Sequence, residues 1–367
     1  KISKNRLAYH VDITRSSMDL YVRERTFLLM LLLGFLVAGL TYQTPQIAMW
    51  VTFLFAGYAA ISNDSIQTLG TFIASNKNTQ WWKLWLFIAS VFLATVSWSW
   101  VNYGGDVSFE RLQAKGFETA PTSFHYLQVA APLFLLILTR LKMPVSTTFL
   151  LLSCYAASGS SIASIALKSV SGYGIAFGTA IVIFFALGPL MKRMFTGDAH
   201  PAWRFAQWIT TGTLWSVWLQ QDAANIAVSL PRAMSGLEFM AFSAVIVVGL
   251  GIMFKKGGER IQEVVEEKSD VADVRSATVI DLIYAVILYV FKIQSKVPMS
   301  TTWVFVGLLA GREMAMAIRK SNSNNRGIRG AMQLMAKDLL YVAIGFIVSL
   351  ILAAAINPVT RVAMFGF

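Results

Sequence analysis

Two short polar motifs, each of which occurs twice, contain the residues of this chain that could do chemistry. The first is an acidic motif with an amide three residues after the carboxylate: Asp64 is followed by Gln67, and Asp222 by Asn225. The second is the pattern Lys-x-Pro-x-Ser-Thr-Thr, at 142–148 and 296–302. The two motifs recur in the same order with nearly the same offset, which indicates an internal repeat.

The acidic motifs offer ligands for small cations, because carboxylate and amide oxygens are hard donors. They lie deep in apolar segments, where a charged side chain costs at least about 2.5–3.5 kcal/mol on insertion scales. A single buried Asp can serve helix packing alone, but two at repeat-related positions, each beside amides, favour a functional role. The candidate cation-binding residues are Asn63, Asp64, Gln67, Gln221, Asp222 and Asn225.

The hydroxyl motifs offer donors for an anion. Each presents three hydroxyl groups and, if a helix follows, free backbone N–H groups at the positive end of the helix dipole. The alternative is that the hydroxyls bond back to carbonyls of their own helix, which explains a pair with Pro and Lys at fixed offsets less well. Lys142 and Lys296 either attract the anion or form structural ion pairs. The candidate substrate-binding residues are Asp64, Ser146, Thr147, Thr148, Asp222, Ser300, Thr301 and Thr302.

An anion beside two carboxylates poses an electrostatic problem. At about 4 Å, like charges repel by roughly 4 kcal/mol at an effective dielectric constant of about 20. A bound cation, or a substrate oxygen that carries its own proton, removes the conflict. Both indicate cation-coupled transport or a protonated substrate, and phosphate carries a proton at neutral pH whereas sulfate does not.

The elements that must position these motifs are membrane helices. Of 367 residues, 56% are hydrophobic and only 14% are charged, against about 25% charged in a soluble domain, so an ordinary soluble enzyme is excluded. The net charge of +12 comes from basic residues between apolar runs, which is the positive-inside pattern and not that of a nucleic-acid-binding protein. Runs long enough to span a bilayer occur at 26–43, 46–75, 81–103, 172–191, 205–231, 235–254 and 333–357.

Two further apolar runs, 124–141 and 277–294, each lead into a hydroxyl motif and then become apolar again. A Pro followed by three hydroxyl residues is a poor lipid-facing helix, and non-helical backbone at membrane depth requires burial in protein or a wet cavity. We therefore expect two re-entrant hairpins, near 124–167 and 277–318. With a cytoplasmic N-terminus, this layout places 21 Lys and Arg on the inner side and 5 on the outer side.

The predicted fold class is an all-α polytopic membrane protein, an inverted-repeat transporter with about seven full spans and two re-entrant helical hairpins. The predicted organisation begins with a cytosolic segment, 1–25. Region 26–254 holds the first transmembrane helix, the first repeat and the start of the second (205–254). A charged cytosolic linker, 255–275, precedes the rest of the second repeat and the final helix, 276–367. We expect a multi-pass protein of the cell inner membrane.

The paired motifs resemble those of the PiT family of inorganic phosphate transporters, which are cation-coupled phosphate symporters with repeated G-x-N-D-x-x-N-type and P-V-S-T-T motifs. Here 144–148 read PVSTT, 298–302 read PMSTT, and 62–64 and 221–225 match the acidic motif in part. The stretch 205–225 is similar to the family's approach to its second acidic motif, and the resemblance covers about 46–357. It implies that the hydroxyl residues contact the oxyanion beside Asp64 and Asp222, with the four amides near the coupling cations.

The chain departs from the family pattern around both motifs. The family's first Asn is Gln67 here, and the Asn before the second Asp is Gln221. The His that commonly follows the hydroxyl motif is Phe149 in one copy and Trp303 in the other, and the expected glycine pair is 61–62, Ile-Ser. These changes leave the ion, Na⁺ or H⁺, and the anion open. Sulfate is the second candidate, because some relatives with this architecture are sulfate permeases.

The predicted function is secondary active transport: symport of inorganic phosphate with Na⁺, or with H⁺, by alternating access at a midplane site. The expected partners are phosphate (or sulfate) and the lipid bilayer, with no nucleic acid, no enzyme activity, no cofactor and no metal beyond the coupling cation; self-association into a homo-oligomer is left open. An intramembrane aspartyl enzyme, with two Asp sharing a proton, would leave the duplicated hydroxyl motifs unexplained. An anion channel would share the anion site but need no cation. The sequence has no nucleotide-binding loop, which disfavours an ATP-driven pump.

Overall fold

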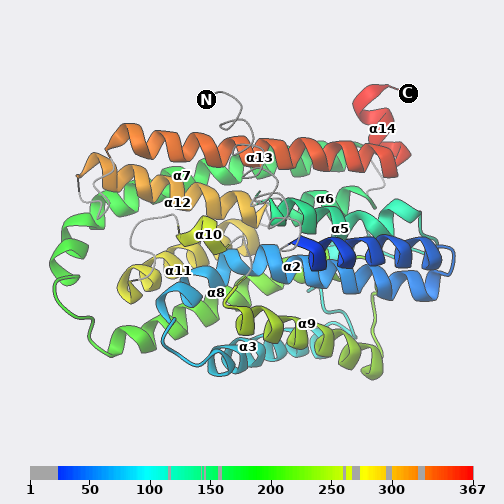
Figure 1. Ribbon diagram of the computed structural model, residues 1–367, viewed down its shortest axis with the longest axis horizontal. Helices are drawn as coiled ribbons and strands as arrows, with labels where there is room; N and C mark the ends of the chain where they lie inside the picture. Colours follow the sequence, from blue (N-terminus) through cyan, green and yellow to red (C-terminus); the bar gives the residue numbers. More distant parts are fainter. Residues whose placement is uncertain are drawn as a thin grey trace, which may run out of the picture.

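The computed structural model describes residues 24–114, 117–141, 143, 146–155, 159–258, 262–266, 273–294, 300–320 and 327–366. Throughout these ranges the regular elements are helices (Figure 1). They are a first helix, Glu24–Thr41, then α2 (Pro45–Ser75), α3 (Trp81–Asn102), α4 (Arg111–Ala114), α5 (Tyr126–Arg140), α6 (Thr147–Ser153), α7 (Gly159–Met194), α8 (Ala202–Ile226), α9 (Gly236–Lys256), α10 (Gln262–Glu266), α11 (Val274–Leu288) with a π-helical continuation (Tyr289–Gln294), α12 (Thr301–Ile318), α13 (Ile328–Ile356) and α14 (Pro358–Phe365).

Seven helices in the described part of the chain are long and apolar enough to cross a membrane, as a multi-pass membrane protein requires. Six of them coincide, within a few residues at each end, with segments that the sequence predicts as spans. The seventh is Val274–Phe291, which the sequence assigns to the first arm of a hairpin. Conversely, the predicted span 205–231 forms α8, which is 25 residues long but is not among the seven. The seven are Glu24–Thr41, Pro45–Ser75, Trp81–Asn102, Val170–Met191, Gly236–Lys256, Val274–Phe291 and Ile328–Ile356.

Helix α2 forms the centre of the bundle (Figure 1). Every residue from Ala59 to Ala74 is buried, whichever side of the helix it occupies. A helix that is buried on all sides lies in the protein interior, so the polar residues of this stretch are withdrawn from water whichever way they point. This burial is what places the first acidic motif in the interior.

Helix α8 packs antiparallel to α2. Polar contacts show this, since the end of each helix meets the start of the other. The Asn76 Nδ2 atom, just after α2, donates to Gln207 Oε1 near the start of α8 at 2.8 Å. At the other end, Ser229 Oγ, just after α8, donates to the Met49 carbonyl near the start of α2 at 2.9 Å. The two acidic motifs therefore lie on neighbouring helices that run in opposite directions.

Helices α7 and α12 pack at very close range, and two glycines allow it. A Cβ atom on Gly307 would lie 2.5 Å from the Tyr173 carbonyl oxygen, and one on Gly311 would lie 2.4 Å from that of Phe177. Small residues four apart let helix backbones approach in this way in membranes. The contact holds α12, which begins with the second hydroxyl motif, firmly against α7.

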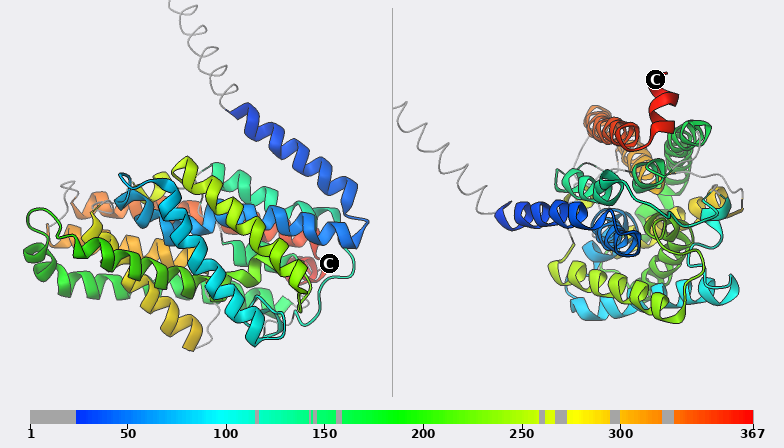
Figure 2. Two further views of the ribbon diagram at one scale, coloured as in Figure 1. Left: turned by 90° about the horizontal axis from the view of Figure 1, so that it is seen from below. Right: turned by 90° about the vertical axis from the view of Figure 1, so that its right-hand side faces the viewer.

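The first helix lies at the edge of the bundle and packs against α5. Gly34 faces the Leu133 side chain, and Arg140 Nε at the end of α5 donates to Glu24 Oε2 at 2.6 Å. The rest of its surface is apolar and exposed, as a lipid-facing helix requires, and Figure 2 shows it as the outermost helix of its side. The predicted cytosolic segment 1–25 lies outside the described residues apart from 24–25, as do 259–261 and 267–272 of the predicted linker 255–275.

Candidate functional site

The first acidic motif is a buried cluster of amides around one carboxylate. Asp64 Oδ1 accepts hydrogen bonds from Asn63 Nδ2 at 2.7 Å and from Gln67 Nε2 at 3.2 Å. The hydroxyls of Ser62 and Ser65 on the same helix donate to backbone carbonyls one turn earlier. The hydroxyls of this segment therefore bond within the helix backbone, while the Asp64 carboxylate accepts from the two amides beside it.

The second acidic motif repeats this geometry on α8. Asp222 Oδ1 accepts a hydrogen bond from Asn225 Nδ2 at 2.6 Å, and Asp222, Gln221 and Asn225 are all buried. The residue three positions after each Asp is therefore an amide donor to that Asp in both motifs, as their shared spacing on an α-helix allows.

Each acidic motif also contacts the hydroxyl motif of the other half of the chain. Gln67 Nε2 donates to Thr302 Oγ1 at 2.9 Å, and Asn225 Nδ2 donates to Thr148 Oγ1 at 2.8 Å. Thr148 Oγ1 in turn lies 3.4 Å from Asp222 Oδ1. In each of the two cases, an amide of the acidic motif thus joins the carboxylate of that motif to the last threonine of a hydroxyl motif.

The hydroxyl motifs lie at the starts of α6 and α12, and all six hydroxyl residues are buried. Ser300 is the N-cap of α12, and its Oγ accepts from Trp303 N–H at 3.4 Å. At the start of α6, Leu150 N–H donates to the Ser146 carbonyl at 3.0 Å. The predicted Lys and Pro partners at 142, 144, 296 and 298 lie outside the described residues, so their roles stay predictions.

Several buried polar atoms of these motifs have no hydrogen-bond partner within the part of the chain that the structure describes. They are Gln67 Oε1, Thr147 Oγ1, both polar atoms of the Gln221 amide, and Asn225 Oδ1. Buried polar groups in proteins are nearly always paired, and the exceptions commonly mark a bound ion, a water or a functional site. Their accumulation in the two predicted motifs is typical of a site that accepts a polar ligand.

The structure adds three charged or polar residues that the motif analysis missed. Tyr284 Oη donates to the Thr301 carbonyl at 2.9 Å, which fixes the backbone of the second hydroxyl motif. Asp281, one turn earlier on α11, is 1% exposed and accepts hydrogen bonds from Thr71 on α2 and Thr211 on α8. An Asp inside the apolar run 277–294 is itself a signal of function in a membrane segment, and it was available from the sequence.

The third missed residue is Arg111, at the start of the short helix α4 in the loop after α3. Burial lowers the pKa of its guanidinium, while the negative charge of Asp222 acts in the opposite direction. Arg111 Nε has no hydrogen-bond partner in the described ranges. A cation within electrostatic reach of Asp222 bears directly on the repulsion between this carboxylate and an anion. The sequence offered only its basic side chain in a predicted outer loop.

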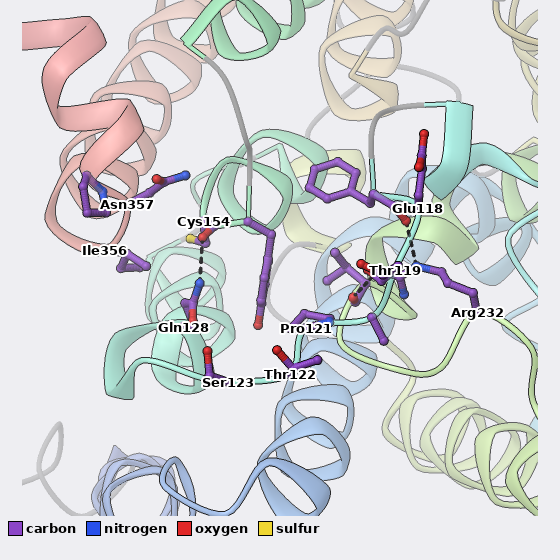
Figure 3. Close-up of a pocket in the computed structure, with 15 residues that line it drawn as sticks. Glu118, Thr119, Pro121, Thr122, Ser123, Gln128, Cys154, Arg232, Ile356 and Asn357 are labelled. Atoms are coloured by element: carbon purple, nitrogen blue, oxygen red, sulfur yellow. Dashed lines mark hydrogen bonds between the residues drawn. The ribbon is translucent and has the colours of Figure 1, made fainter.

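A separate pocket of about 430 Å³ opens where the 117–123 loop, the end of α6 and the turn before α14 meet (Figure 3). Arg232 lines it but is committed to the backbone: its guanidinium donates to the carbonyls of Phe117 at 2.9 Å, Leu230 at 2.7 Å and Thr119 at 3.0 Å. Burial lowers the pKa of Arg232. This arginine therefore fastens the loop to the segment after α8, and the pocket contains none of the predicted site residues.

Within the described residues, no three His, Cys, Asp or Glu side chains gather in a group that could hold a metal ion. The arrangement instead pairs single carboxylates with amides and hydroxyls, which suits weakly held cations and an oxyanion. Comparison of the chain with protein-family models, with curated proteins and with solved structures gave no match in any of the three.

Proposed function

We propose that this protein is a secondary active transporter that carries inorganic phosphate in symport with a cation, Na⁺ in the first instance and H⁺ as the alternative, across the cell inner membrane. The observation that carries the proposal is the pair of matching contacts between each acidic motif and the hydroxyl motif of the other half, Gln67 with Thr302 and Asn225 with Thr148. Each contact brings potential cation ligands next to potential anion donors in the buried interior, which supports a single site made from both pairs.

The anion would be held by hydroxyl groups of both halves, Ser146, Thr147, Thr148, Ser300, Thr301 and Thr302, with the N-terminal N–H groups of α12 as further donors. Cations would bind among Asp64, Asp222 and the amides Asn63, Gln67, Gln221 and Asn225. The amide oxygens and the Gln221 nitrogen that have no partner in the described part of the chain support both assignments, because a polar ligand would satisfy them.

Coupling follows from charge. Two carboxylates repel a phosphate dianion, and each bound cation removes part of that repulsion, so anion and cation bind more favourably together than apart. Alternating access follows from the pairing, because the site is shared between elements of two different halves. If α2 and α12 moved as one unit relative to α8 and α6, the site would open to one side of the membrane.

The test is uptake of radiolabelled phosphate into proteoliposomes with an inward Na⁺ gradient, an inward H⁺ gradient or neither, and with unlabelled sulfate as a competitor. We expect uptake that requires one of the gradients and resists sulfate. Uptake of sulfate in place of phosphate would identify a sulfate permease of the same architecture. Anion flux that is independent of both gradients would support a channel and contradict symport.

A further inference from the structure

Asp281 is a buried carboxylate that belongs to neither the acidic nor the hydroxyl motifs. It joins α2 and α8, the two helices that carry the acidic motifs. Thr71 Oγ1 on α2 donates to its Oδ1 at 2.6 Å, and Thr211 Oγ1 on α8 donates to its Oδ2. All three residues are at most 1% exposed. The two carboxylate oxygens thus bind two different helices, and a single side chain of α11 ties α2 to α8.

The contact lies to one side of the acidic motifs. Thr71 follows Asp64 by seven residues, about 10 Å along α2, and Thr211 precedes Asp222 by eleven, about 16 Å along α8. Both displacements point toward the end where α2 finishes and α8 begins. On the predicted topology this is the cytoplasmic side of the site.

Other polar contacts close the bundle at the same end. Beyond Asp281, Gln207 on α8 bonds to Ser75 and Asn76 at the end of α2. The linker helix α10 covers α2 there as well, since Gln262 Nε2 donates to the Gly70 carbonyl at 2.9 Å and Val265 would lie 2.9 Å from a Cβ atom on Gly70. Opening the bundle toward this side would require contacts of this group to break.

Two carboxylates take part at this end, and they differ in burial: Glu266 on α10, which pairs with Lys77 at 3.0 Å, is exposed, whereas Asp281 is buried. An amide in its place would offer one acceptor oxygen instead of two, so it could keep only one of the bonds from Thr71 and Thr211. Hydrogen bonds contribute little net free energy one by one, so two of them, from two helices to one side chain, give a specific but separable junction between α2 and α8.

We propose that Asp281 is a positioning residue that acts as the cytoplasmic latch of the transport site. It holds α2 and α8 together while the site is closed to the cytoplasm, and its bonds to Thr71 and Thr211 break when the site opens to that side. The proposal rests on the proposed transport function for its purpose, but the latch itself is a conformational property that can be measured without any substrate.

The experiment measures the rate at which a thiol reagent, added from the cytoplasmic side, labels a single cysteine. Cys154, the one cysteine of the sequence, is replaced by Ala, and Ala74→Cys, one turn beyond Thr71 and 4% exposed, reports on the closed end. Loss of one buried hydrogen bond, which leaves the remaining polar atom without its partner, shifts a two-state equilibrium by about tenfold. Thr211→Val, Thr71→Val and Asp281→Asn should therefore each raise the labelling rate of the Ala74→Cys protein about tenfold.

Matched controls separate a latch from a loss of stability. Thr211→Ser keeps the hydroxyl and should label at the parent rate, as should Thr213→Val, an exposed threonine on α8 that bonds back to its own helix. A second reporter, Ala48→Cys, is buried near the opposite end of α2. Its labelling from the outer side should not rise in the latch variants.

Equal increases at Ala74→Cys and Ala48→Cys would overturn the proposal, since they would mean general loosening of the fold. Unchanged labelling at Ala74→Cys in all three latch variants would also overturn it. Phosphate uptake by the same proteins is a separate readout: normal uptake with unchanged labelling rejects the latch alone, and latch-dependent labelling in a protein that moves no anion rejects the proposed function alone.

Discussion

The two hydroxyl motifs lie in regions with the same polar contacts and different scaffolds. The first region consists of α5, α6 and the acidic motif of α8, and the second of α11, α12 and the acidic motif of α2. In each, an amide three residues after an Asp bridges that Asp and a threonine, with distances of 2.6 and 2.8 Å in the first region and 3.2 and 2.9 Å in the second.

The scaffolds differ in length and in support. Helices α5 and α11 both have 15 residues, but α6 ends after seven whereas α12 continues for 18. The longer helix is supported by its glycine contact with α7, at Gly307 and Gly311. The polar geometry is thus common to both regions while the helices around it are not, which indicates that the repeated motifs specify the site and that packing partners decide the helix lengths.

The carboxylates also differ in their surroundings. Asp64 accepts from two amides, Asn63 and Gln67. Asp222 accepts from one amide and one hydroxyl, its neighbour Gln221 has no partner in the described part of the chain, and Arg111 lies within electrostatic reach. We infer that the first acidic motif is the more complete by itself and that the second acidic motif depends more on ligands.

The largest expected effect comes from removal of either carboxylate charge. Asp64→Asn and Asp222→Asn should each lower coupled uptake at least about tenfold, because hydrogen bonds and ion contacts to a charged group contribute roughly 1.5–3 kcal/mol. Expression and thermal unfolding in detergent serve as the control for folding. Wild-type uptake in one variant would break the equivalence of the two regions and remove that Asp from the site.

Loss of a bridging threonine hydroxyl should have the next largest effect. Thr148→Val and Thr302→Val keep the shape and remove the acceptor of Asn225 and of Gln67, so each should weaken anion affinity by about three- to tenfold. Substrate affinity is measured from the concentration dependence of uptake. Thr139→Val, a buried threonine that bonds back to its own helix, is the matched control. A defect in one variant only would mean that a single region binds the anion.

Replacement of Gln221 distinguishes a ligand-binding amide from an unsatisfied structural one. Gln221→Met removes both polar atoms at similar volume. If the amide binds a cation, the cation concentration for half-maximal uptake should rise about fivefold, as expected for a bond worth roughly 1 kcal/mol. Higher thermal stability with unchanged cation dependence would be the contrary result, and it would assign Gln221 to packing.

Arg111 lies within electrostatic reach of Asp222, so its loss should affect the region of Asp222 and not that of Asp64. Arg111→Gln should raise the phosphate concentration for half-maximal uptake by about two- to threefold at low salt, and by less at high salt because salt screens the long-range attraction between the guanidinium and the entering anion. An effect on Vmax with no effect on affinity would contradict a role in attracting the anion.

The smallest expected effect concerns the helix caps. Asp273 caps α11 by accepting from Arg275 N–H at 2.8 Å. Burial raises its pKa, but the hydrogen bonds from Arg275 outweigh burial and leave the pKa below its usual value. A depressed pKa gives stability that is present above the ordinary Asp pKa of about 3.9 and lost as pH falls through the lower value. Asp273→Asn keeps a good cap, so its unfolding temperature should fall by only a degree or two at pH 7 and depend less on pH below about 4. An identical pH profile in both proteins would argue against this charge effect.

Much of the candidate site was predictable because its residues are polar in an apolar sequence. Asp64 and Asp222 stand out in their segments for this reason, and the recurrence of the hydroxyl motif identified six further residues, all of which are buried. Asp281 satisfies the same criterion and was overlooked only because it occurs once. Tyr284 and Arg111 could not be found in this way, since a tyrosine in an apolar run and an arginine in a loop are ordinary until their neighbours are known.

By itself, the sequence determined the class of the protein and the location of most of its spans, because about 20 consecutive apolar residues are required to cross a bilayer whatever they pack against. It also determined which polar groups would be buried, since they lie in those spans. Only the tertiary structure decided which groups meet: Gln67 with Thr302, 235 residues apart, Asn225 with Thr148, and Asp281 with two helices at once. Hydrogen bonds act over about 3 Å, and periodicity along a chain contains no information on which distant helix lies within that range.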